Sequence, residues 1–187
     1  MKSNETLIDY GNGNQILFLH QPVSIEKLKQ DLSEATEAYR KSPGILNKLD
    51  WMSVKADYMF RTGKDEDAAK FLEKELASIH EISNSHEFLT RYLGVLESIT
   101  EILICIKRPD DALKYANWVM EICDNHFHES VEYAYGEHLY ACVCLALGRK
   151  DQAKDYLEDA LSRLKDELDT MKRIKEDIEE SLRTEMD

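Results

Sequence analysis

The chain contains little proline and glycine, with three prolines and seven glycines in 187 residues. Both residues interrupt regular structure, so their scarcity excludes a loop-rich fold and favours long helices joined by short turns. Long apolar runs are also missing: no segment approaches the length that spans a bilayer, and the first residues lack the basic segment and apolar core of a signal peptide. We therefore expect a cytoplasmic protein that makes no membrane contact.

Paired cysteines and clustered basic charge are absent as well. The four cysteines, Cys105, Cys123, Cys142 and Cys144, show neither Cys-x-x-Cys pairing nor the spacing of a disulfide framework. We expect them to be buried free thiols, which suits a reducing compartment. The chain carries 24 Lys and Arg against 37 Asp and Glu, a net charge of -13. Nucleic-acid binding needs clustered Lys and Arg, so nucleic acid is not an expected partner.

Recognised catalytic and metal-binding motifs are missing too. The Gly11-Asn12-Gly13 segment lacks the third glycine and the following helix of a phosphate-binding loop, and no Gly-x-Ser-x-Gly motif occurs. His126 and His128 follow Cys123, and these residue types suit zinc, but nothing nearby supplies the other half of a four-ligand site. We expect no metal, no cofactor and no enzymatic activity.

What the chain does contain is one pattern repeated three times: a helical stretch, a tight turn, and a second helical stretch with an alanine near its start. The turn residues and the alanines five positions later are Gly63 and Ala68, Lys107 and Ala112, and Gly148 and Ala153. Small residues at a helix crossing let two helices approach closely. A helical hairpin cannot bury its apolar face alone, so the three hairpins should stack into one scaffold.

The periodicity and the capping residues predict seven helices. Their approximate ranges are 24–41, 45–62, 65–82, 86–107, 109–123, 129–147 and 150 to the end of the chain. Before them, two apolar runs flank the segment Gly11-Asn12-Gly13-Asn14, which is a strong β-hairpin signal. We divide the chain into a hairpin-like segment at 1–21, a repeat domain at 22–161 and a charged amphipathic extension at 162–187.

The two turns that begin at Gly63 and Gly148 resemble those of the tetratricopeptide repeat superfamily. The middle turn departs from that pattern at Lys107, where glycine is usual. The alanine spacings of 44 and 41 residues exceed the roughly 34 of the standard repeat, so the helices should be longer than standard. The resemblance implies an all-α superhelix in which the first helix of each pair lines a concave groove.

The same resemblance selects the residues that should face this groove. The site residues are Asp50, Ser53, Asp57, Phe60, Glu97, Glu101, Tyr135 and His138. Aligned positions beside them are Arg61, Gly94, Ile104, Cys105, Cys142, Leu145 and Ala146. The set is acidic at one end and apolar or aromatic at the other.

This composition indicates the kind of partner. Superfamily members that hold chaperone C-terminal carboxylates carry Lys and Asn in the groove, where this chain has Asp57, Glu97 and Glu101. The prediction is a protein-protein interaction module, such as an adaptor, chaperone or immunity-like partner, that binds a basic or amphipathic segment. The alternative is a helical enzyme or small-molecule sensor that uses His138 with Tyr133, Tyr135 and Tyr140.

The last predicted helix carries an apolar stripe at three- and four-residue steps. Its members are Leu157, Leu161, Leu164, Leu168, Met171, Ile174, Ile178 and Leu182. The preceding helix can cover the stripe only to about Asp169. The remainder either bends near Asp169-Thr170 to cap the repeats, protrudes, or pairs with a second copy in a homodimer, although Lys175 interrupts a strict heptad.

Overall fold

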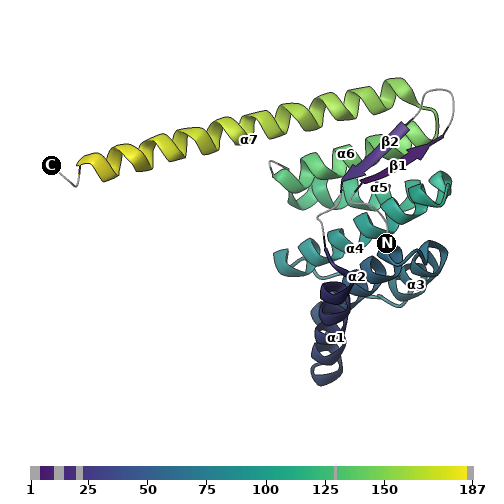
Figure 1. The fold of residues 1–187 in the computed structure, drawn as a ribbon. Helices are drawn as coiled ribbons and strands as arrows, with labels where there is room; N and C mark the ends of the chain where they lie inside the picture. Colours follow the sequence, from purple (N-terminus) through teal and green to yellow (C-terminus); the bar gives the residue numbers. More distant parts are fainter. Residues whose placement is uncertain (1–4, 11–14, 20–22, 129, 185–187) are drawn as a thin grey trace.

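The computed structural model describes residues 5–10, 15–19, 23–128 and 130–184, and it confirms an all-α repeat fold (Figure 1). The helices are α1 (Ile25–Lys41), α2 (Ile45–Arg61), α3 (Asp65–Ala77), α4 (His86–Cys105), α5 (Pro109–His126), α6 (Val131–Ala146) and α7 (Lys150–Thr184). Two strands, β1 (Glu5–Asp9) and β2 (Gln15–Leu19), form an antiparallel pair in which Ile8 lies opposite Ile16. The Asn-Gly turn between them lies outside the described residues.

Serine caps set the start of three helices. The hydroxyl oxygens of Ser24, Ser85 and Ser130 accept hydrogen bonds from backbone N–H groups three residues later, at 3.1, 3.3 and 3.4 Å. These bonds satisfy donors that have no partner inside the helix. At α5 the first turn instead contains Pro109, which needs no N–H partner, followed by two aspartates that favour the positive helix terminus.

The three turns between paired helices have the same geometry. Gly63, Lys107 and Gly148 all have positive φ angles, of 80°, 61° and 75°. In each turn the next residue donates a backbone hydrogen bond back across the helix end: Lys64 to Met59 at 2.9 Å, Arg108 to Leu103 at 2.8 Å and Arg149 to Cys144 at 2.8 Å. A helix end that is closed by a backbone hydrogen bond of this kind normally has glycine at the position with positive φ. Lys107 therefore adopts the glycine conformation, and the middle repeat departs from the other two in sequence but not in backbone.

Two helix ends differ from the sequence prediction. Helix α3 ends at Ala77 rather than near Ile82, because the Ser78 hydroxyl donates to the Glu75 carbonyl at 2.6 Å and competes with continued helix. The Lys48 ammonium group holds Ser78 in place at 2.6 Å. Helix α5 runs on past Cys123 to His126.

The helices pack as antiparallel hairpins that stack on one another. Helix α2 packs on α3 and α4, and α6 packs on α4, α5 and α7. Ala68, Ala112 and Ala153, the alanines of the repeated pattern, are each 0% exposed, as close helix crossings require. Helix α1 packs on α2 and closes one end of the stack.

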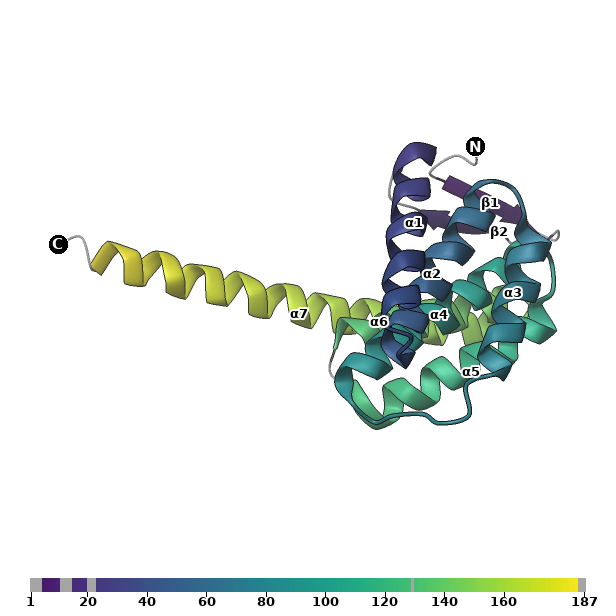
Figure 2. The ribbon, with the colours of Figure 1, turned by 90° about the horizontal axis from the view of Figure 1, so that it is seen from below.

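Helix α7 is much longer than its neighbour. It continues for 35 residues without interruption, whereas α6 has 16. Both ribbon views show it leaving the stack as a straight rod (Figures 1 and 2). The alternative in which the helix bends near Asp169 and folds back over the last repeat is therefore wrong. The structure leaves the protruding tail and the homodimer.

Candidate functional site

The surface lined by α2, α4 and α6, which we call the concave face, is partly filled by the chain itself. The β-hairpin lies on α6 through β2, and Ile8 and Ile16 are buried in the main core. The Tyr10 hydroxyl, just after β1, donates a hydrogen bond to the Ile104 carbonyl. Burial and the nearby thiols of Cys105 and Cys142 raise the pKa of Tyr10 to about 12. The hairpin thus occupies the end of the predicted groove that contains Ile104, Cys105 and Cys142.

The α2 part of the concave face is acidic, but its carboxylates are ion-paired. Asp50 accepts a hydrogen bond from the Arg91 guanidinium group of α4 at 2.8 Å. Asp57 accepts one from Arg61, one turn further along α2, at 3.1 Å. Ser53 is half-buried on the same helix. Because each aspartate already has a cationic partner in the fold, neither is available as an unneutralised charge for a ligand.

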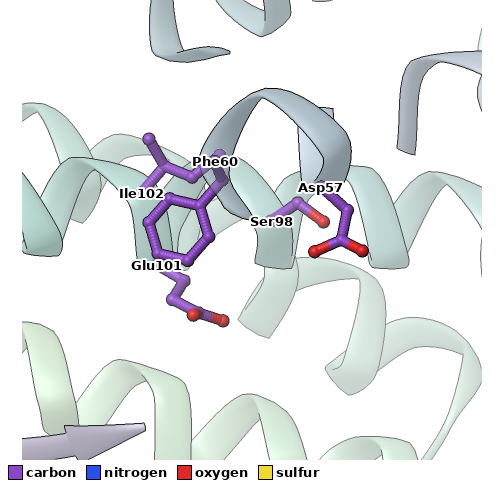
Figure 3. Close-up of a pocket in the computed structure, with 5 residues that line it drawn as sticks. All are labelled: Asp57, Phe60, Ser98, Glu101 and Ile102. Carbon is purple, nitrogen blue, oxygen red and sulfur yellow. The ribbon is translucent and has the colours of Figure 1, made fainter. Parts of the chain in front are cut away.

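Asp57, Phe60 and Glu101 line a hollow of about 50 Å³ between α2 and α4 (Figure 3). Ser98 and Ile102 of α4 complete its lining. The hollow is large enough for water or the end of one side chain, and too small for a cofactor. Ser98 and Ile102 were missing from the predicted set because that set used fixed offsets from each turn.

A second group of carboxylates lies between α4 and α6. Burial, together with the charges of Glu132 and Glu101, raises the pKa of Glu97 from its usual range to about 7. Burial followed by the charges of Glu97 and Glu101 raises the pKa of Tyr135. The structure therefore brings together Glu97, Glu101 and Tyr135 of the predicted site and adds Glu132, from the first turn of α6. The neighbouring charges that help to raise the pKa of Glu97 mark this as the candidate site.

His138 lies beside this group on α6. Its ring centroid is 6.1 Å from that of Tyr135, and its Nε2 is 3.8 Å from the Cys142 sulfur. Burial lowers the pKa of His138, so the ring is neutral at physiological pH. Burial, followed by the charge of Glu101, raises the pKa of Cys142 to about 12, which keeps the thiol protonated. A protonated thiol is a poor nucleophile, so this pair lacks the activation that cysteine catalysis needs.

Tyr135 and His138 also border an apolar groove between α6 and α7, with a volume of about 360 Å³. The remaining lining is Val131 and Ala134 of α6 and Leu157, Ala160, Leu161 and Leu164 of α7. We call this the terminal groove. Five of these residues, among them Leu161 at 68%, are exposed large hydrophobic side chains.

Among the described residues, no group of three or more His, Cys, Asp or Glu is arranged to hold a metal ion. In the same part of the chain, every helix is too short or too polar to cross a bilayer.

Comparison with known proteins gives a likeness in structure alone. No protein-family model matches the sequence, and no curated protein matches it. BtubC (BKLC) from P. vanneervenii is similar with a TM-score of 0.56 and 18% identity, over 74% of this chain and 55% of BtubC. A putative kinesin light chain from Podosopora anserina with nearly identical TPR-like repeats gives a TM-score of 0.37 and 15% identity, over 74% of this chain and 84% of its own.

The chain thus spans about 55% of the length of BtubC. Its three helical hairpins, which share one turn geometry and one buried alanine position, confirm the resemblance noted in the sequence. The protein is an all-α repeat protein whose fold is similar to that of BtubC.

Proposed function

We propose that the protein is a cytoplasmic interaction module, without enzymatic activity, that binds a basic or amphipathic segment of another protein on its concave face. The observation that supports this most is the carboxylate group between α4 and α6. The charges acting on Glu97 are those of Glu132 and Glu101, so an approaching Lys or Arg would relieve their mutual repulsion.

The two halves of the concave face differ in how well they suit such a segment. On α2, Asp50 and Asp57 already pair with Arg91 and Arg61. Beyond the α4 carboxylates, the hairpin covers Ile104 and Cys142. We place the partner at the remaining part of this face, around Glu97, Glu101, Tyr135 and His138. The tyrosine and histidine rings offer apolar area next to the charge, which suits an amphipathic segment.

A binding experiment with matched variants tests this proposal. Two fluorescent peptides, one of leucine and lysine and one of leucine and glutamate, are titrated with the protein while anisotropy is recorded. The basic peptide should bind, and added salt should lower its affinity because the contact is electrostatic. The Glu97→Gln/Glu101→Gln double variant should bind this peptide about tenfold more weakly, which corresponds to about 1.4 kcal/mol.

The control removes the same charge elsewhere. Asp155 and Asp159 are exposed on α7, and Asp155→Asn/Asp159→Asn should leave the affinity within twofold of the unmodified chain. Equal loss in both double variants would show a nonspecific effect of net charge and would contradict the proposed site. Tighter binding of the acidic peptide would contradict the predicted charge preference.

A further inference from the structure

The terminal groove is the surface on which another helix would pack if the stack continued. Inside the molecule, α4 packs on the α2–α3 pair and α6 packs on the α4–α5 pair. The α6–α7 pair presents the equivalent surface, and Leu157, Leu161 and Leu164 line it while remaining exposed. A repeat stack needs a cap at such an end, because each hairpin leaves one apolar side uncovered.

The projecting half of α7 offers a helix of the right kind. The last described contacts between α7 and the rest of the protein are those of Arg163, which donates to Glu137 at 3.1 Å and to the His128 carbonyl at 2.9 Å. The helix continues from there to Thr184. Leu168, just beyond this point, is 55% exposed. The sequence of the remaining helix repeats apolar residues at Met171, Ile174, Ile178 and Leu182.

This stripe matches the groove-lining stripe when two copies of α7 run antiparallel. In heptad terms, Leu157, Leu164, Met171 and Ile178 occupy d, and Leu161, Leu168, Lys175 and Leu182 occupy a. Antiparallel helices pair a with d. One register then aligns every layer at once: Leu157 with Leu182, Leu161 with Ile178, Leu164 with Lys175 and Leu168 with Met171.

We infer that the occupant of the terminal groove is the C-terminal half of α7 from a second copy of this chain. The pairing is reciprocal, so each copy caps the repeat stack of the other around a two-fold axis between residues 168 and 171. A single interface of this kind is closed and gives a dimer rather than a filament.

The antiparallel arrangement also accounts for Lys175. In a parallel pair Lys175 would face its own copy, and two like charges would meet at a core position. In the antiparallel pair it lies level with Leu164, so no two like charges meet in this layer. The flanking residues carry charges of both signs, among them Lys165 and Asp166, so the apolar layers supply most of the attraction.

Light scattering on the full chain gives the first test. The expected mass is twice the 21.7 kDa of one chain. Leu161→Asp places a charge in the groove and should return the mass to that of one chain, whereas Ser162→Asp, at an exposed position beside the stripe, should leave the dimer intact. Circular dichroism melting verifies that both variants fold. A monomeric unmodified chain, or a dimer that survives Leu161→Asp, would overturn the inference.

Disulfide trapping tests the register. Leu161→Cys combined with Ile178→Cys should give a covalent dimer under oxidation, because the two introduced thiols meet across the interface. Within one helix they are about 25 Å apart and cannot join. The single variant Leu161→Cys should not cross-link, and the unmodified chain measures any background from the four native thiols. Cross-linking by the single variant would show a parallel pair, and none by the double variant would show another register, and either result overturns the arrangement.

Discussion

The two ends of the repeat stack differ in how their apolar side is covered. At the first end α1 lies along α2, and Tyr39 stacks on Trp51 at a centroid distance of 5.5 Å, so the apolar side of α2 is covered within the chain. At the last end the terminal groove stays open and Leu161 is 68% exposed. One amphipathic helix, α1, is thus sufficient to cover the apolar side of the first end. Helix α7, in contrast, extends away from the last end and does not cover it.

The charges on the concave face follow the same division. Near the closed end Asp50 and Asp57 have arginine partners. Between α4 and α6, burial and the charges of Glu132 and Glu101 raise the pKa of Glu97 to about 7. The closed end is thus covered within the chain and its aspartates are ion-paired, whereas the last end leaves large apolar side chains such as Leu161 exposed.

The largest expected effect is at the closed end. Trp51 stacks on Tyr39 and meets the edge of Phe71 at 5.2 Å, so Trp51→Ala removes the ring that joins three helices. We expect the free energy of unfolding to fall by about 3 kcal/mol in urea denaturation. Leu161→Asp at the open end, compared with the unmodified chain at a concentration where both are monomers, should change the free energy of unfolding by less than about 0.5 kcal/mol, since the side chain is exposed in the single chain. Similar losses at both ends would contradict the comparison.

Replacing a buried alanine by leucine should lower stability more in the middle of the stack than at its open end. Ala112 belongs to the main core, whereas Ala153 lies in a small separate cluster with Ala141 and Cys144. Ala112→Leu should cost about 1 to 3 kcal/mol, because α4 and α6 both pack on α5 and confine the site. Ala153→Leu should cost less, because α7 has a free side toward which it can shift. Denaturation midpoints of the two variants provide the measurement, and an equal loss would indicate equal confinement.

The carboxylates between α4 and α6 should also show their charge in the pH dependence of stability. The folded pKa of Glu97, about 7, exceeds that of the unfolded chain, so the folded protein holds an extra proton at intermediate pH. Stability from this group is fully present below the unfolded pKa of a glutamate, about 4.3, and is lost as the pH rises from there through 7. Glu97→Gln should therefore be more stable than the unmodified chain at pH 8, by about 1 to 2 kcal/mol, and nearly equal to it at about pH 4. A constant difference would contradict this origin.

The smallest effect concerns the turn between the two ends. Lys107 has a φ of 61°, a conformation that costs a residue with a side chain about 1 kcal/mol relative to glycine. Lys107→Gly should raise the melting temperature by a few degrees, and Gly63→Ala, at the equivalent turn nearer the closed end, should lower it. If Lys107→Gly has no effect, contacts of the lysine side chain offset its backbone strain.

The elements that could be predicted from the sequence are those set by local chemistry. The cap at Ser24, the turns at Gly63 and Gly148 and the proline at Pro109 are signals contained within a few residues, and together with the apolar periodicity they predict all seven helices. The position of the hairpin could not be predicted, because Tyr10 and Ile104 meet only through the stacking of distant repeats.

Site prediction was limited for the same reason. Fixed offsets from the turns placed Glu97, Glu101 and Tyr135 on one surface, and the electrostatic coupling among them agrees with that placement. The offsets could not reveal that Arg91 pairs with Asp50 across two helices, or that Glu132 contributes its charge. The repeat gives the direction in which a residue faces, whereas its partners depend on the rotamers of neighbouring helices.

The hydrogen bond from Tyr10 to Ile104 has a consequence for synthesis on the ribosome. The repeats can fold one after another as they emerge, since each contacts mainly its neighbours. The hairpin is made first but must wait for α4 and α6, which end at Cys105 and Ala146. At ordinary elongation speed that delay is roughly ten seconds. Throughout it, two short apolar strands are exposed, and a nascent-chain factor that recognises extended apolar segments would have time to bind them.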